Sequence, residues 1–194
     1  MMNWWEIISA VLGLTCVVLA GRNSKYNFWV GYLYNICLFI LFWRQSLYAA
    51  MILQPVAFAI NLFGHWRWTH PRPGEESAED SRRLKVSRIN KQQWSAYLLI
   101  VVLLGTTLAG VLDGRTDDPS PWLDSYILMF TFLAQYLSAQ KCLECWIIWL
   151  VVNAANIALY LSSGLWVMAG VASLYLINGV WSILSWRKLY KKNS

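Results

Sequence analysis

Residues 146–160 read WIIWLVVNAANIALY, a stretch with no charged residue. Polar and aromatic side chains recur in it at steps of three and four, as on one face of an α-helix. That face carries Trp146, Trp149, Asn153, Asn156 and Tyr160. The other faces are Ile, Leu, Val and Ala, which suit lipid, whereas amides at bilayer depth need another helix or a polar solute as partner. The stretch therefore predicts one wall of a solute path through a membrane.

The lengths of the apolar segments in the rest of the chain also indicate a membrane protein. Of its 194 residues 58% are hydrophobic, which by itself suits either an apolar globular domain or a membrane protein. Apolar segments of about 17–25 residues fit a hydrocarbon core about 30 Å thick. Seven such segments are predicted, at 4–20, 27–43, 46–66, 94–112, 122–139, 145–161 and 165–186. The predicted fold class is an all-α membrane protein with seven transmembrane helices.

The positive charges predict how these helices are oriented. Of the 16 Lys and Arg residues, Arg44 and Arg115 alone fall on the side of the N-terminus in an alternating topology. Because loops rich in Lys and Arg stay in the cytoplasm, we predict that the N-terminus lies outside the bacterial inner membrane and that the C-terminus lies in the cytoplasm. The net charge of +6 then needs no nucleic-acid partner. The first segment follows no Lys or Arg and contains Glu6, so we interpret it as a retained span and not a signal peptide.

Two halves of the chain are weakly similar. Asn35 and Asn153 are 118 positions apart, and Trp66 and Trp186, each followed by Arg, are 120 apart. Both three-helix sets begin on the same side because one extra helix restores the orientation, which predicts parallel repeats in a 3+1+3 arrangement. The predicted units are a first repeat (1–66), a charged cytoplasmic linker (67–93), a linker helix (94–112), a second repeat (122–186) and a basic tail (187–194).

The spans carry little charge. Spans 2, 4, 6 and 7 have no Asp, Glu, Lys or Arg in their apolar interior, while Glu6, His65 and Asp124 lie near the ends of theirs. Proton- or sodium-coupled carriers usually keep an ionisable group within the membrane because its burial is too costly without a function. We therefore predict movement of a solute down its own gradient.

Amide and aromatic residues within the spans are the candidate binding residues. Amides donate and accept hydrogen bonds, which suits sugar hydroxyls and carboxamides, and indole rings stack on flat rings and attract cations. The alternative for each amide is a contact between helices, worth roughly 0.6–2 kcal/mol. The predicted ligand class is a flat ring, including a cationic one, on a polyhydroxyl group. The predicted substrate-binding set is Asn35, Gln54, Asn61, Gln135, Trp149, Asn153, Tyr160, Tyr175, Asn178 and Trp181.

Other conspicuous residues have simpler explanations. Most Trp residues, including Trp68 and Trp186, are predicted at the headgroup level because they fall at span ends. A lone C-x-x-C at Cys142 and Cys145 is weak support for zinc, which wants four ligands, so no metal, cofactor or catalytic residue is predicted. The basic half of the linker is expected to lie against anionic headgroups.

Several motifs in this chain resemble those of one transporter family. They are LYAAMILQ at 47–54, Asn61 with Gly64-x-Trp66-x-Trp68, Trp146-x-x-Trp149-x-x-x-Asn153, Gly164-Leu165 and the Trp186-Arg187 ending. From about residue 6 to residue 188 the chain resembles the PnuC family of bacterial nicotinamide riboside transporters. The resemblance implies a fold related to SWEET transporters and facilitated diffusion of nicotinamide riboside. It also implies a homotrimer and trapping by a cytoplasmic kinase that supplies NAD biosynthesis.

The resemblance also suggests roles for the candidate residues. Trp149 and Trp181 would flank the pyridinium, and Gln135, Asn153 and Asn178 would contact carboxamide or ribose. Asn35, Gln54 and Asn61 would contribute from the first repeat. Thiamine, riboflavin and deoxynucleosides are alternative substrates, and Cys145 stands where relatives often have Asn. A membrane-embedded enzyme and a structural scaffold are alternatives of other classes, but the sequence contains no H-E-x-x-H motif and no Gly-rich phosphate loop.

Overall fold

Seven helices make up most of the structure, a computed structural model that describes residues 4–44, 48–78, 80–113, 115, 120–162, 164 and 166–193. The helices are α1 (Trp4–Gly21), α2 (Tyr26–Arg44), α3 (Tyr48–Thr69), α4 (Lys91–Leu112), α5 (Pro121–Ala139), α6 (Glu144–Ser162) and α7 (Trp166–Asn193). The prediction of seven helices is confirmed. Residues 46, 47 and 165 of the predicted segments lie outside the described ranges.

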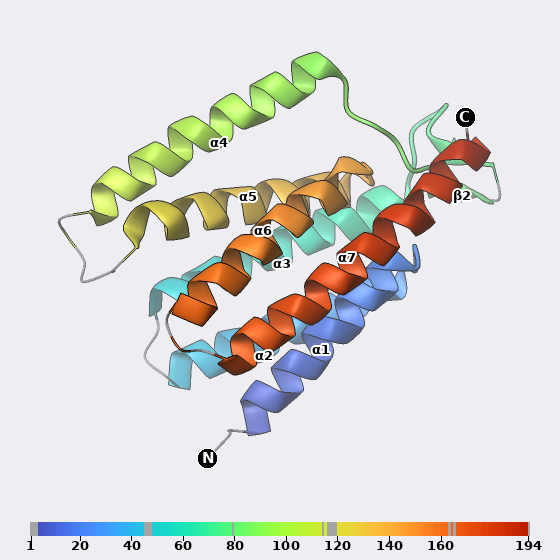
Figure 1. The fold of residues 1–194 in the computed structure, drawn as a ribbon. Coiled ribbons are helices and arrows are strands. Elements are labelled where there is room, and N and C mark those ends of the chain that lie inside the picture. Colours follow the sequence, from blue (N-terminus) through green and yellow to red (C-terminus); the bar gives the residue numbers. More distant parts are fainter. Residues whose placement is uncertain are drawn as a thin grey trace.

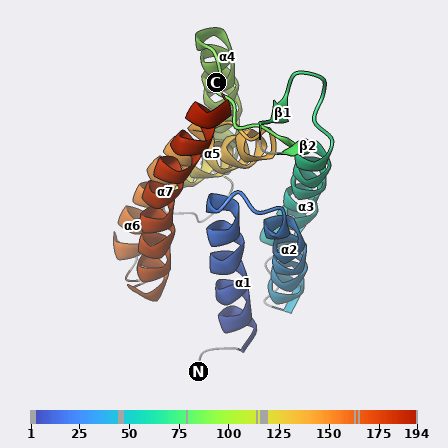
Figure 2. The ribbon, with the colours of Figure 1, turned by 90° about the vertical axis from the view of Figure 1, so that its right-hand side faces the viewer.

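Six of the helices form a closed ring. Neighbours in it are α1 and α2, α2 and α3, α3 and α5, α5 and α6, α6 and α7, and finally α7 and α1. The remaining helix, α4, packs on the outer side of α5 (Figure 1; Figure 2). The start of α4 is defined by a capping box. The Asn90 side chain accepts a hydrogen bond from the Gln93 backbone N–H, and the Gln93 side chain accepts one from the Asn90 backbone N–H.

The helices differ in how apolar they are. By length and composition, α2, α4, α6 and α7 could each cross a membrane, and α1 contains a shorter apolar run, Ile7–Gly21. On α4 the side chains of Leu99, Leu103 and Leu104 are more than half exposed, an apolar surface that suits lipid. The other two helices carry polar residues within them, Gln54 and Asn61 in α3 and Thr131 and Gln135 in α5.

A short antiparallel hairpin of β1 (Glu76–Ser77) and β2 (Asp80–Leu84) lies between α3 and α4, near the C-terminal end of α7 (Figure 1). We call this end of the ring the hairpin end. The chain after the hairpin binds the connection between α5 and α6 through backbone hydrogen bonds, from Ser87 N–H to the Lys141 carbonyl (3.1 Å) and from Leu143 N–H to the Ser87 carbonyl (3.0 Å). The predicted linker is thus folded against the helices.

The core at the hairpin end corrects the expectation for two tryptophans. Trp68 and Trp186 are 3% and 0% exposed, so protein encloses them and they do not face headgroups, and both pack in a core with Trp146. The Trp68 indole donates to the Ser138 carbonyl (3.0 Å), and that of Trp186 to the Ala20 carbonyl (3.2 Å). The hairpin segment covers this core with Leu84 and Val86, both 3% exposed, which is why indoles at the ends of helices are buried here.

Lys141 is a buried cation in the connection between α5 and α6. Its side chain is enclosed, Nζ donates to the Leu84 carbonyl at 2.6 Å, and Nζ lies 4.5 Å from the centre of the Trp68 ring. Burial, together with the nearby positive charge of Arg83, lowers the pKa of Lys141 to about 7. The lysine thus joins the hairpin to the helical ring at the cost of burying an ammonium group.

This burial predicts a pH dependence of stability. In the unfolded chain the pKa of a lysine is about 10.4, so above pH 7 the unfolded state holds a proton that the folded state has released. The free energy of unfolding should therefore rise from pH 7 to pH 9, by about 2 kcal/mol from this group. Thermal unfolding of the wild type and of Lys141→Met across this range tests it, because the variant should lack that part of the rise. Parallel pH profiles for the two proteins would contradict the assignment.

Candidate functional site

A cavity of about 390 Å³ lies inside the ring. Every ring helix contributes to its lining, and the outer helix α4 does not. The volume falls within the range of about 300–1,000 Å³ that is usual for small-molecule sites. Because residues from both halves of the chain line it, the cavity is the place where the polar faces of the two halves meet.

Most of the residues predicted from the sequence line this cavity. It brings together Asn35 from α2, Gln54 and Asn61 from α3, Gln135 from α5, Trp149 and Asn153 from α6, and Tyr175 from α7. Asn156 and Trp146, which share the helical face of Trp149 and Asn153, line it as well. The stretch 146–160 therefore presents most of its polar and aromatic face to the cavity.

Three predicted residues lie elsewhere. Asn178 is 8% exposed and donates from Nδ2 to the Val17 carbonyl (3.2 Å) and to Ser182 Oγ (3.3 Å), so it joins α7 to α1. Trp181 is 44% exposed on α7, and Tyr160 is half-buried; neither is among the residues that line the cavity. The expected pair of Trp149 and Trp181 around one ring is therefore not formed, because these two indoles do not share a space.

Several polar atoms of the lining have no hydrogen-bond partner among the described residues. They are Asn27 Oδ1, Asn35 Nδ2 and Trp146 Nε1, all buried. A buried polar group without a partner costs about 1–3 kcal/mol. One acceptor and two donors on residues of the same cavity lining thus lack a partner within the described protein, as is expected of a site that binds a polar solute.

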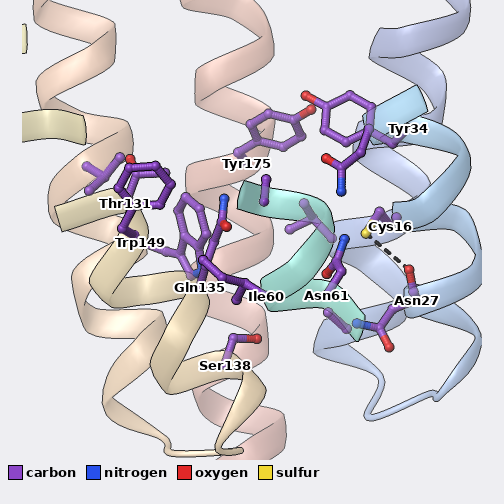
Figure 3. Close-up of a pocket in the computed structure, with 18 of the residues that line it drawn as sticks. Cys16, Asn27, Tyr34, Ile60, Asn61, Thr131, Gln135, Ser138, Trp149 and Tyr175 are labelled. Carbon is purple, nitrogen blue, oxygen red and sulfur yellow. Dashed lines mark hydrogen bonds between the residues drawn. The ribbon is translucent and has the colours of Figure 1, made fainter. Parts of the chain in front are cut away.

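The middle of the cavity combines a flat aromatic surface with amides. Trp149, Gln135 and Asn61 come from three different helices and face the same space (Figure 3). On α6, a hydrogen bond from Nδ2 to the Trp149 backbone carbonyl (2.8 Å) fixes the orientation of the Asn153 side chain. On α5 the Thr131 hydroxyl donates back to the Ile127 carbonyl at 2.7 Å, so its hydrogen is used within its own helix. An indole face beside carboxamides can hold a flat ring and the hydroxyls attached to it.

Glycine allows α2 to approach α3, and α1 to approach side chains of α2 and α7. A Cβ on Gly31 of α2 would lie 2.7 Å from Asn61 Nδ2 on α3, and one on Gly13 of α1 would lie 3.1 Å from the Tyr34 ring. Both glycines line the cavity. They leave room for the Asn61 amide and for the ring of Tyr34, whose hydroxyl is hydrogen-bonded to that of Tyr175.

Some of the lining residues were not among those predicted from the sequence. Asn27, Tyr34 and Cys16 were missed, although Asn27, Gly31, Asn35 and Leu38 recur on one face of α2 and all line the cavity. That spacing was the available signal. Cys16 had none, and its thiol donates to the Asn27 carbonyl at 3.3 Å (Figure 3).

The lining is also uncharged. Of the lining residues that the structure describes, none is Asp, Glu, Lys, Arg or His. Hydrogen bonding, stacking and dispersion are therefore the interactions that the described lining offers to a solute.

Comparisons with known proteins found similar membrane transporters. The sequence profile of the nicotinamide mononucleotide transporter family matches residues 3–188. The chain is 25% identical to the nicotinamide riboside transporter PnuC of Escherichia coli (strain K12), over 87% of this chain and 78% of the relative. It is 28% identical to the riboflavin/roseoflavin transporter RibM of Streptomyces davaonensis, over 83% and 74%. The crystal structure of the vitamin B3 transporter PnuC shares the fold, with a TM-score of 0.77 and 22% identity over 98% of this chain and 83% of that one.

Proposed function

Since the chain belongs to the nicotinamide mononucleotide transporter family, a family of multi-pass membrane transporters, we propose that it carries nicotinamide riboside through the cavity inside the ring. The observation that supports this most is the set of unpartnered polar atoms on Asn27, Asn35 and Trp146 around that cavity. A sealed helical core would have paired these atoms, because unpaired amides at bilayer depth are costly.

The chemistry of the lining suits this substrate. Nicotinamide riboside has a flat cationic ring with a carboxamide, joined to a sugar with hydroxyl groups. We infer that Trp149 stacks on the ring and that Asn35, Asn61 and Gln135 hydrogen-bond the carboxamide or ribose, with Gln54, Asn153 and Tyr175 completing the wall. Trp181 and Asn178 are left out because they do not line the cavity.

We further propose facilitated diffusion. The described lining has no ionisable side chain of the kind that couples transport to a proton or sodium gradient. Net uptake then depends on removal of the solute from the cytoplasm. We propose that a cytoplasmic nicotinamide riboside kinase removes it by phosphorylation, as a step of NAD biosynthesis.

The proposed architecture is a 3+1+3 arrangement. In support, α1–α2–α3 and α5–α6–α7 make the same sequence of neighbour contacts, and the two junctions, α3 with α5 and α7 with α1, are equivalent under a twofold axis. The Lys and Arg bias supports a hairpin end in the cytoplasm and an N-terminus outside the inner membrane. The homotrimer stays a prediction from the family resemblance.

Reconstituted liposomes test the transport proposal. We expect entry of radiolabelled nicotinamide riboside to be saturable, to need no ion gradient, and to exceed entry into protein-free liposomes many-fold. Equal entry into both would support a structural scaffold, and recovery of a chemically altered solute would support an enzyme. A strict requirement for a proton or sodium gradient would contradict facilitated diffusion.

A related vitamin is the second candidate substrate, because RibM, a riboflavin/roseoflavin transporter, is a relative of similar identity. Competition against labelled nicotinamide riboside by thiamine, riboflavin and nucleosides separates the candidates. Nicotinamide riboside should compete at the lowest concentration. If riboflavin binds more tightly, the substrate assignment moves to that vitamin while the site remains the same.

A further inference from the structure

A second cavity, of about 280 Å³, lies at the hairpin end and shares none of its lining residues with the central one. It is formed where the end of α3, the hairpin segment, the start of α4 and the end of α5 meet. Its basic residues are Arg67, Arg72, Lys85 and Arg88. Gln93, Tyr97 and Tyr136 add polar and aromatic groups on the side of α4 and α5.

Positive charge exceeds negative charge in this second cavity. Glu75 is the acidic residue of the described lining, and it pairs with Arg67 at 2.6 Å. Hydrogen bonds from Arg67 and from the Arg72 backbone hold the pKa of Glu75 below its usual value despite partial burial, so it is ionised at neutral pH. Arg88 pairs with the buried Glu144 at 3.0 Å. The two carboxylates neutralise two of the four basic residues, so two positive charges, those of Arg72 and Lys85, are in surplus.

Arg67 supplies an independent observation that points to a ligand. It is 6% exposed, its Nη2 bonds Glu75, and its Nε donates to Gln140 Oε1 at 3.2 Å. The remaining nitrogen, Nη1, is buried and has no hydrogen-bond partner among the described residues. An unpaired N–H of a buried guanidinium is costly, and an acceptor of negative charge would satisfy it.

We propose that this cavity binds a phosphate group. A phosphate monoester carries about −1.5 to −2 charges at neutral pH, which matches the two surplus cations, and a phosphodiester carries about −1 and matches one of them. The oxygens of either are acceptors for the N–H groups of Arg67, Arg72 and Lys85. Two sources offer this chemistry: a phospholipid headgroup reaching the site beside α4, and a soluble phosphate compound. The proposal is independent of the substrate of the central cavity.

Binding to the purified protein distinguishes the two sources. One arm titrates inorganic phosphate calorimetrically into detergent-solubilised protein. The other uses native mass spectrometry to count phosphatidylglycerol retained from nanodiscs of phosphatidylcholine with and without that lipid. Saturable binding in the first arm alone identifies a soluble phosphate, and retention in the second alone identifies the headgroup. Binding in both arms identifies a site that accepts either source.

The variants are chosen to report on this cavity. Arg72→Gln combined with Lys85→Gln should weaken binding about 10-fold or more, because two charge-assisted contacts are lost. Arg67→Gln should do the same, and the double variant keeps the test valid if Arg67→Gln does not fold. Arg83→Gln is the control, since Arg83 lies on the same hairpin but is half-exposed, pairs with Asp80 and does not line the cavity; it should change binding less than twofold. The absence of saturable binding in both arms, or unchanged binding by the double variant, would overturn the proposal.

Discussion

Trp149→Ala should weaken equilibrium binding of nicotinamide riboside about 10- to 100-fold. Its indole is the aromatic surface that faces Gln135 and Asn61 across the central cavity (Figure 3). Stacking and cation–π attraction to a pyridinium together contribute about 1–3 kcal/mol, which corresponds to this range. Trp149→Phe keeps a flat ring and should recover part of the affinity, which separates lost stacking from lost packing.

Trp181→Ala is the matched control. Trp181 is the other aromatic residue that the sequence singled out, but it is 44% exposed and lies outside the cavity lining. Its removal should change binding less than twofold. A large loss for Trp181→Ala together with a small one for Trp149→Ala would show that the substrate binds elsewhere. Thermal unfolding of each variant serves to exclude general loss of structure.

Asn35→Leu should make the protein more stable and a poorer binder at once. Asn35 is 5% exposed, lines the cavity, and its Nδ2 has no partner among the described residues. Leucine has a similar size and removes an unpaired polar group that costs about 1–3 kcal/mol, so the unfolding temperature should rise. The same change removes a hydrogen bond to the substrate, and we expect about 10-fold weaker binding.

Asn178→Leu should make the protein less stable and leave binding nearly unchanged. Its amide donates to the Val17 carbonyl and to Ser182 Oγ between α7 and α1. Leucine would remove the bond to the Val17 carbonyl and take the Asn178 N–H away from the buried Ser182 Oγ, which lowers stability by about 1–3 kcal/mol. Binding of nicotinamide riboside should change less than twofold. If Asn35→Leu instead destabilises the protein as Asn178→Leu does, Asn35 is a contact between helices and not a binding residue.

Helix count and much of the cavity lining could be predicted because both depend on local periodicity. The spacing of Trp149, Asn153 and Asn156 puts them on one face whatever the surrounding structure, and that face must avoid lipid. Periodicity cannot say what the face meets. Asn153 and Asn178 look alike in sequence, yet one lines a space and the other bonds a neighbouring helix, because the position of α1 beside α7 is a tertiary fact.

The hairpin end was the part least accessible to sequence reasoning. The segment 67–93 reads as a charged linker, and the two strands in it are two and five residues long. Their position depends on contacts distant in sequence, such as Ser87 with Lys141 and Arg88 with Glu144. Trp68 and Trp186 were placed at the membrane surface for the same reason, since only the fold shows that the hairpin segment covers them.

The central claim is that the cavity inside the ring holds the substrate. An experimental structure of the protein with nicotinamide riboside tests it most directly. The account predicts the pyridinium against the Trp149 indole, with Asn35 Nδ2 or Asn27 Oδ1 hydrogen-bonded to the ligand. Ligand bound outside the ring, or a ring interior closed by paired amides with no ligand in it, would contradict the account.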